Sequence, residues 1–154
     1  MEKPSPIKLP DALEQEAREE EHRMRNERIQ QMREEGTLHL HLIDFLKEFE
    51  KKVNDFNYYT MMFLPYDTIS RTVKGIIRDR LRILQDFYHG FNGVNPHALI
   101  IEVAEIGMPG SADIRAVYLR LSAALTSLNE HVANISEKRV VYHVQPASKE
   151  FDWT

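Results

Sequence analysis

Apolar residues recur at intervals of three and four along most of the chain after residue 37. At about 100° per residue, this spacing places apolar side chains on one face of a helix. Three long segments follow the pattern, at about residues 38–60, 67–91 and 111–136, and a shorter apolar stretch covers about residues 96–106. The pattern predicts an all-α fold, a small helical bundle of three amphipathic helices with a short fourth helix.

The buried faces of these segments can be read from the same spacing. The last segment has the most regular repeat, formed by Ile114, Val117, Tyr118, Leu121, Leu125, Leu128, Val132 and Ile135. The buried face of the second segment is predicted to contain Ile69, Val73, Ile76, Ile77, Leu84, Phe87 and Phe91. Helix-breaking or capping residues lie between the segments, which supports these boundaries. They are Pro65, Asp67 or Thr68 as a cap, Gly90, Asn95 as a cap, and the sequence GMPGS with Ser111 as a cap.

Residues 11–36 have a different pattern, because charged residues lie on nearly every side of the predicted helix. Its first half, residues 14–21, has five glutamates and one arginine, and its second half, residues 23–33, has four arginines and one glutamate. Acidic residues near the N-terminal end of a helix and basic residues near its C-terminal end interact favourably with the helix macrodipole. Apolar residues are too sparse to bury a face within one domain, so this helix is predicted to project or to lie on a neighbour, with Gly36 as a break.

The two ends of the chain are predicted to be arms. Residues 1–10 contain Pro4, Pro6 and Pro10, and proline fixes φ and removes a hydrogen-bond donor, which favours an extended arm. The bundle is assigned to residues 37–137, and residues 138–154 form the other arm, a short C-terminal strand with an aromatic tail.

The C-terminal arm is predicted to bind a partner. The stretch RVVYHV is β-branched and aromatic, is stopped by Pro146, and has no expected strand partner in its own bundle. Strand addition to a neighbour would pair its backbone, and the aromatic side chains would anchor it. The alternatives are a hairpin with the N-terminal arm and a tail folded back on the bundle. The predicted partner-binding residues are Val140, Tyr142, Val144, Phe151 and Trp153.

A second candidate surface lies on the segment RTVKGIIRDRLRIL. On a helical wheel, its basic stripe occupies about 80° of the circumference, opposite the apolar face. The stripe consists of Arg71, Lys74, Arg78 and Arg82. The guanidinium group of arginine forms paired hydrogen bonds with carboxylates and with phosphates, so these residues are predicted to bind a partner. The alternative is a solvated outer face.

Arg80 lies elsewhere on the same helical wheel, between the predicted buried residues Val73 and Phe87. Burying a guanidinium without a partner is costly. Two explanations remain open: a buried ion pair with a carboxylate of another segment, or an interface with another subunit.

Composition and motifs narrow the class of protein. The chain of 154 residues is the size of one domain, has a formal net charge of −4, and contains no cysteine. The net charge argues against a general nucleic-acid coat protein, and the lack of cysteine excludes thiolate metal ligands and a cysteine nucleophile. The pairs Glu35/His39 and Asp86/His89 are too few for a dinuclear carboxylate site, so we expect no metal and no cofactor. No motif of a nucleophilic or phosphate-binding enzyme is present, so no catalytic residue is expected.

These observations predict a non-enzymatic structural or assembly protein. Its arms and charged helix would dock it into a larger complex with copies of itself or with a second protein. By analogy of architecture, this description fits a virion component such as a connector or adaptor of tailed-phage particles. The alternative is a helical nucleic-acid-binding regulator that uses the basic stripe. The N-terminus lacks the apolar core of a signal peptide and no apolar run is long enough to span a bilayer, so we expect a protein of the cytoplasm or of a virion, without a membrane partner.

Overall fold

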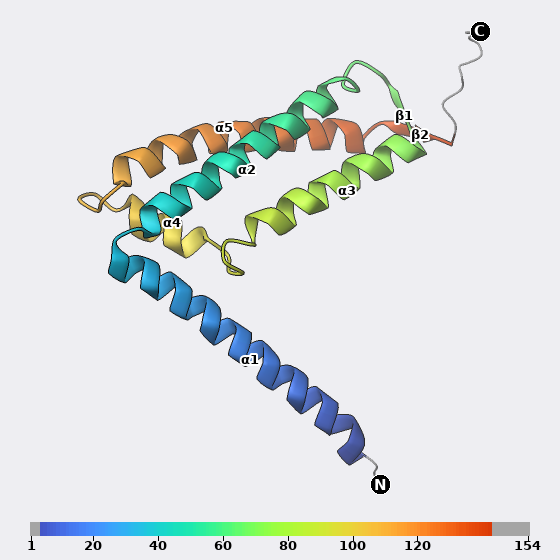
Figure 1. Ribbon diagram of the computed structural model, residues 1–154. Helices are drawn as coiled ribbons and strands as arrows, with labels where there is room; N and C mark the ends of the chain where they lie inside the picture. Colours follow the sequence, from blue (N-terminus) through green and yellow to red (C-terminus); the bar gives the residue numbers. More distant parts are fainter. Residues whose placement is uncertain (1–3, 143–154) are drawn as a thin grey trace.

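The computed structural model describes residues 4–142, with side chains from residue 12 onward, and within this range the chain is mostly helical. Figure 1 shows the elements, which are α1 (Pro4–Glu35), α2 (Leu38–Met61), β1 (Thr68–Ser70), α3 (Arg71–Tyr88), α4 (His97–Ala104), α5 (Ser111–Ser136) and β2 (Arg139–Val141). The predicted all-α bundle is confirmed. Each of the four bundle helices covers most of the segment that the apolar periodicity predicted.

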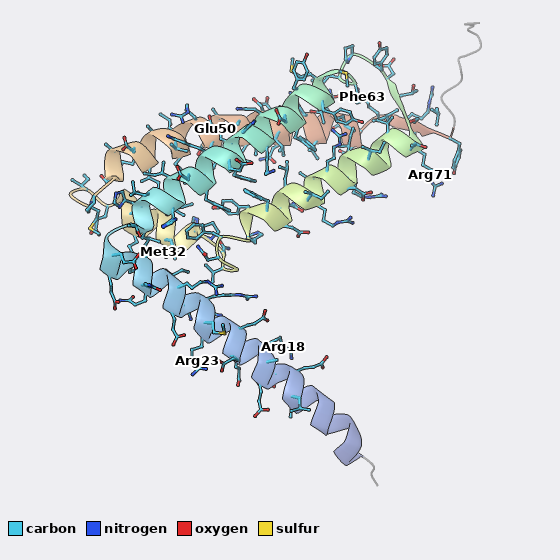
Figure 2. All side chains as sticks on the ribbon, viewed as in Figure 1. Arg18, Arg23, Met32, Glu50, Phe63 and Arg71 are labelled. Atoms are coloured by element: carbon cyan, nitrogen blue, oxygen red, sulfur yellow. The ribbon has the colours of Figure 1, made fainter. Side chains whose placement is uncertain are left out.

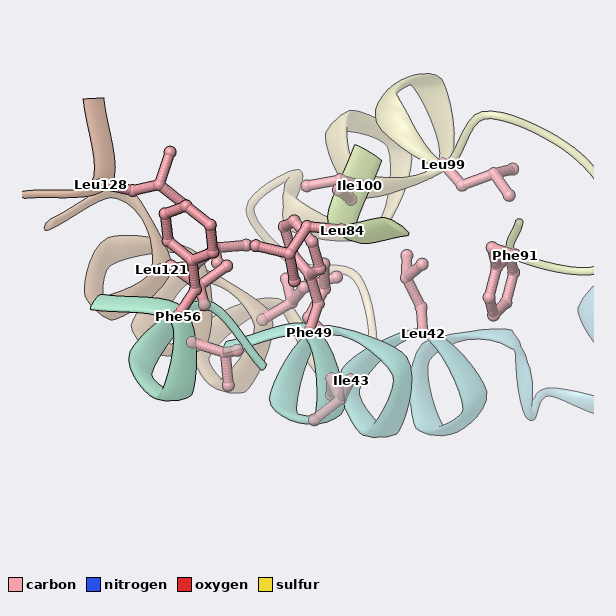
Figure 3. Packing of buried hydrophobic residues seen from close by; sticks show 14 of the residues in the cluster. Leu42, Ile43, Phe49, Phe56, Leu84, Phe91, Leu99, Ile100, Leu121 and Leu128 are labelled. Carbon is pink, nitrogen blue, oxygen red and sulfur yellow. The ribbon is translucent and has the colours of Figure 1, made fainter. Parts of the chain in front are cut away.

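The core is built on α2 and α5, which run side by side in the same direction (Figure 1). The side chains of Leu42, Leu46 and Val53 on α2 and of Ile114 and Leu121 on α5 are completely buried, and Figure 3 shows part of this packing. Polar contacts fix the register of the two helices: Arg120 binds Glu50 at 3.1 Å, and Thr60 Oγ1 lies 2.9 Å from His131 Nδ1. Apolar burial is the main favourable term in folding. Since α2 and α5 carry these fully buried side chains, this helix pair forms the centre of the bundle.

Aromatic side chains join α3 to α2. The ring of Phe45 stacks on Phe87 with centroids 5.0 Å apart, and Phe49 contacts Tyr88 at the same separation. The helix begins at Arg71 because the hydroxyl of Ser70 accepts a hydrogen bond from the Val73 N–H at 3.1 Å. A serine in this position satisfies one of the backbone donors that a helix start leaves free. The predicted cap at Asp67 or Thr68 is therefore displaced to Ser70.

The C-terminal strand has a partner within its own bundle, so the prediction that it has none is wrong. β2 pairs in parallel with β1, and Ile69 lies opposite Val140 in the register. The reason is that the chain between α2 and α3 passes this site in an extended conformation before Ser70 starts the helix. Lys138 adds a link to the same connection, because its Nζ donates to the carbonyls of Leu64, at 3.1 Å, and of Tyr66.

The prediction of an extended N-terminal arm is also wrong for residues 4–10, which form the first turns of α1. Proline is compatible with a helix start, because the first four N–H groups of a helix have no acceptor within it. Pro4 and Pro6 lie within those first four positions. Pro10 lies further in and leaves the carbonyl of Pro6 without its usual donor. The charged helix therefore begins before residue 11, where the sequence analysis had placed its start.

α1 is held to the bundle at its C-terminal end and projects from it over the rest of its length (Figure 1). Ile29 is buried, and Met32 packs against the core, as the side-chain view in Figure 2 shows for Met32. In contrast, residues 12–24 are all exposed. α1 ends at Gly36, whose φ of +72° suits a residue without Cβ, and the Thr37 N–H closes the end by donating to the Met32 carbonyl at 2.9 Å. The predicted projecting helix is therefore present.

Candidate protein-interaction surface

The basic stripe lies on one side of α3, where the helix meets solvent. Arg71, Arg78 and Arg82 are exposed and Lys74 is half-buried. Arg82 Nη1 lies 3.6 Å from Asp79, and both side chains are well exposed, so this pair neutralises little of the stripe. The stripe therefore offers cations to a partner or to solvent, and its binding role stays a prediction.

The N-terminal end of α3 brings the stripe next to β2. The Arg71 guanidinium lies over the ring of Tyr142, 5.3 Å from its centroid. Val140 follows Arg139 in the adjacent strand. Three of the predicted partner-binding residues, Arg71, Val140 and Tyr142, are thus gathered at one end of the molecule. Val144, Phe151 and Trp153 lie outside the described residues.

Arg80 is exposed, so the prediction of a buried ion pair is wrong. Its guanidinium lies over the ring of Tyr59, 4.0 Å from the centroid, between α3 and α2. A cation over an aromatic face is favourable and needs no carboxylate. Ile76, which was also predicted to lie on the buried face, is 38% exposed, because the buried face of α3 is narrower than the spacing indicated. An interface at Arg80 with another subunit stays a prediction.

An apolar groove separates α3 from α5, and the sequence did not reveal it. Phe49 of α2 forms part of its lining, together with Leu81, Leu84 and Tyr88 of α3 and Leu125, Leu128 and Val132 of α5. The groove encloses about 240 Å³ and is open to solvent. The sequence contained one indication of this groove. Leu81 and Tyr88 are seven residues apart and lie beside the buried pair Ile77 and Leu84, which has the same spacing, so the apolar face of α3 is wider than its buried strip.

The two rims of this groove differ in charge. On α3, the exposed charged residues next to the groove are Arg82 and Asp86, which carry opposite charges, and the rest of the basic stripe precedes the groove along the helix. On α5, the exposed residues next to the groove are Thr126, Asn129 and Ala133, which carry no charge. Tyr88 lies in the lining, where burial, and secondarily Tyr118, raises the pKa of its hydroxyl. The groove combines an apolar lining with an α3 rim that carries charges of both signs and an α5 rim that carries none.

Another apolar area lies between α4 and α5. Ile101 is 61% exposed and Leu119 is 73% exposed, and both line a shallow cavity of about 390 Å³. Large apolar side chains grouped on a surface are typical of contact sites. This area, like the groove, is a candidate site for another protein.

Two further searches concern metals and membranes. Among the side chains of residues 12–142, no group of three or more histidine, aspartate or glutamate residues is arranged to hold a metal ion. Within residues 4–142, no helix has the length and apolar character needed to cross a membrane.

No protein-family model matches the chain, and neither the curated proteins nor the solved structures gave a match.

Proposed function

We propose that this chain is a non-enzymatic structural protein that docks into a larger homo- or hetero-oligomeric complex through its charged helix and the surfaces around α3. The observation that carries the proposal is α1, a helix of 32 residues anchored to the bundle at its C-terminal end. A helix this polar gains little from its own domain, because residues 12–24 bury nothing against it. Small proteins with projecting elements of this kind are used in large symmetric assemblies, and a virus particle, with a connector or adaptor role, is the setting we favour.

The experiment is to measure the native mass of the complex that contains the chain in extracts of cells that produce it. The intact chain should run well above its own mass of 18.1 kDa. A chain lacking residues 1–26 should run as the free protein, because it lacks the projecting helix. If the intact chain also runs as the free protein in the extract, the proposal is wrong.

The second candidate function is a nucleic-acid-binding regulator, and the exposure of three cations of the basic stripe favours it. Phosphate contacts release counterions, so binding through the stripe should weaken steeply as salt rises. A salt titration of DNA and RNA binding separates the two functions. An assembly protein should show no measurable binding at physiological salt, and a steep salt dependence would favour the regulator.

A further inference from the structure

The groove between α3 and α5 leaves apolar side chains open to solvent. Its lining includes Leu81, Leu125 and Val132, each only half-buried, and it encloses about 240 Å³. An apolar cavity of about 150 Å³ is large enough to hold a benzene ring. The groove therefore has room for an aromatic side chain, and burying one there would remove apolar surface of both partners from water.

The sequence beyond the described residues supplies two such side chains. Phe151 and Trp153 alternate with two acids in the stretch EFDW. In an extended segment, alternate side chains lie on one face, about 7 Å apart. Both aromatic side chains would then share one face, and the two acids would share the other. The groove follows α3 from Leu81 to His89, about 12 Å at 1.5 Å per residue, so it is long enough for both rings.

The position of β2 brings the start of this segment close to the groove. Figure 1 shows that β1 and β2 lie where α3 begins and α5 ends. Val132 of the groove is about 6 Å along α5 from the end of that helix at Ser136. On α3, Arg71 lies over the ring of Tyr142, and at 100° per residue it points within about 40° of Gln85 in the groove. The segment after Tyr142 therefore starts on the side of α3 that carries the groove.

The segment is also long enough to reach the groove. Along α3, Leu81 and His89 are about 15 Å and about 27 Å from Arg71. Phe151 follows Tyr142 by nine residues, a span of about 30 Å when extended. A tether this short gives an effective concentration on the order of millimolar. The segment of the same chain is therefore favoured over the same segment of a second copy.

We propose that Phe151 and Trp153 dock into the groove between α3 and α5 of their own chain. The segment then covers the groove, and another protein reaches the lining only by displacing it. This inference goes beyond the proposed function, because the contact lies within one chain and forms in the isolated protein.

Tryptophan fluorescence of the purified full chain tests the contact, because Trp153 is the only tryptophan. One variant carries N129E, which places a carboxylate in the groove, where it repels the negative face of an aromatic ring and the acids of the segment. The matched control is N134E, the same substitution at an exposed position of α5 that does not line the groove. Acrylamide should quench Trp153 about threefold more efficiently in N129E than in the wild type or in N134E, because the ring is then exposed.

Phe151→Ser tests the same contact from the side of the segment. This variant leaves residues 12–142 unchanged, so it does not disturb the packing of the bundle. Loss of one of two aromatic anchors should raise the quenching of Trp153 about twofold. If either F151S or N129E leaves the quenching of Trp153 unchanged, the proposal is wrong.

Protein concentration distinguishes the segment of the same chain from that of a second copy. Docking within one chain gives the same quenching at about 1 µM and at about 100 µM. Protection of Trp153 only at the higher concentration, with a dimer in sedimentation velocity, would show docking between copies and overturn the proposal. If Trp153 is as accessible in the wild type as in N129E at both concentrations, the groove is left for another protein. In that case this inference fails, and the proposed function, which is tested in extracts, stands.

Discussion

Arg33 lies where α1 meets the bundle, and its ion pair with Glu102 links α1 to α4. The Nε and Nη2 atoms of Arg33 each donate to a Glu102 carboxylate oxygen at 2.8 Å, which is a bidentate contact. These hydrogen bonds hold the pKa of Glu102 below its usual value and raise the pKa of Arg33. Both side chains are about one-third exposed, so solvent screens the pair, and we expect it to contribute about 0.5–1 kcal/mol.

Replacing Glu102 with Gln should destabilise the protein by about that amount at neutral pH. The lowered pKa of Glu102 gives the direction of the pH dependence. The stabilisation is present above the ordinary glutamate pKa of 4.5 and is lost as pH falls toward the lowered pKa. The difference in unfolding free energy between wild type and E102Q should therefore shrink as pH falls from neutral to about pH 3. Urea denaturation across this range measures it.

E48Q is the matched control for that series. Glu48 pairs with Lys52 at 3.6 Å on the exposed side of α2, an i, i+4 contact within one helix. Its loss should change stability by a few tenths of a kcal/mol at most. If E102Q behaves like E48Q at every pH, the Arg33 pair does not hold α1 to the bundle.

Among the secondary-structure elements, helices were predictable from the sequence and strand pairing was not. A helix of 18 residues or more shows several turns of apolar repeat, so α2, α3 and α5 could be located without a structure. β1 has three residues, Thr68–Ser70, which are too few to show an alternation. Its pairing with β2 joins segments about 70 residues apart, and no local pattern encodes such a contact.

The candidate surface was predictable in part, for a related reason. The basic stripe follows from the spacing of residues within α3, and its exposure needs only that the opposite face is buried. The groove depends on how far apart α3 and α5 lie, which the packing of both on α2 determines. Arg80 illustrates the same limit: a helical wheel gives its direction, but the width of the face that α2 covers decides its burial.

Removing β2 should lower stability without destroying the bundle. A chain ending at residue 137 loses the cover of Ile69, which is 4% exposed, and the two hydrogen bonds of Lys138. We expect a loss of about 2 kcal/mol with cooperative unfolding retained. A chain ending at residue 142 keeps both contacts, and it is the reference against which this loss is measured in urea. Equal stability of the two shortened chains would show that β2 contributes nothing to the fold.

At the scale of the whole molecule, α1 and the bundle behave as two parts with different energetics. The bundle buries the apolar side chains of four helices, whereas the N-terminal half of α1 buries none of the side chains of residues 12–24. Deleting residues 1–26 should therefore leave the melting temperature nearly unchanged. Calorimetry of the purified chains measures this.

The anchored end of α1 supplies the contrasting variant. Ile29 is 4% exposed, and Ile29→Ala should cost about 2 kcal/mol, the lower end of the range for such a substitution in a core. If the deletion of residues 1–26 lowers the melting temperature as much as Ile29→Ala does, the N-terminal half of α1 belongs to the stability of the domain. The loss of a native complex on deletion could not then be attributed to a lost contact.

The left-handed glycine at the end of α1 makes that helix a lever. With its base at Gly36, the helix of 32 residues extends about 48 Å, so a rotation of about 10° at the base displaces the tip by about 8 Å. In the complex proposed for this chain, the angle at this base would set where the tip of α1 lies relative to the bundle. An unchanged helix would then reach contact sites at different positions around one bundle, and the Arg33–Glu102 ion pair beside its base would favour one of those positions only weakly.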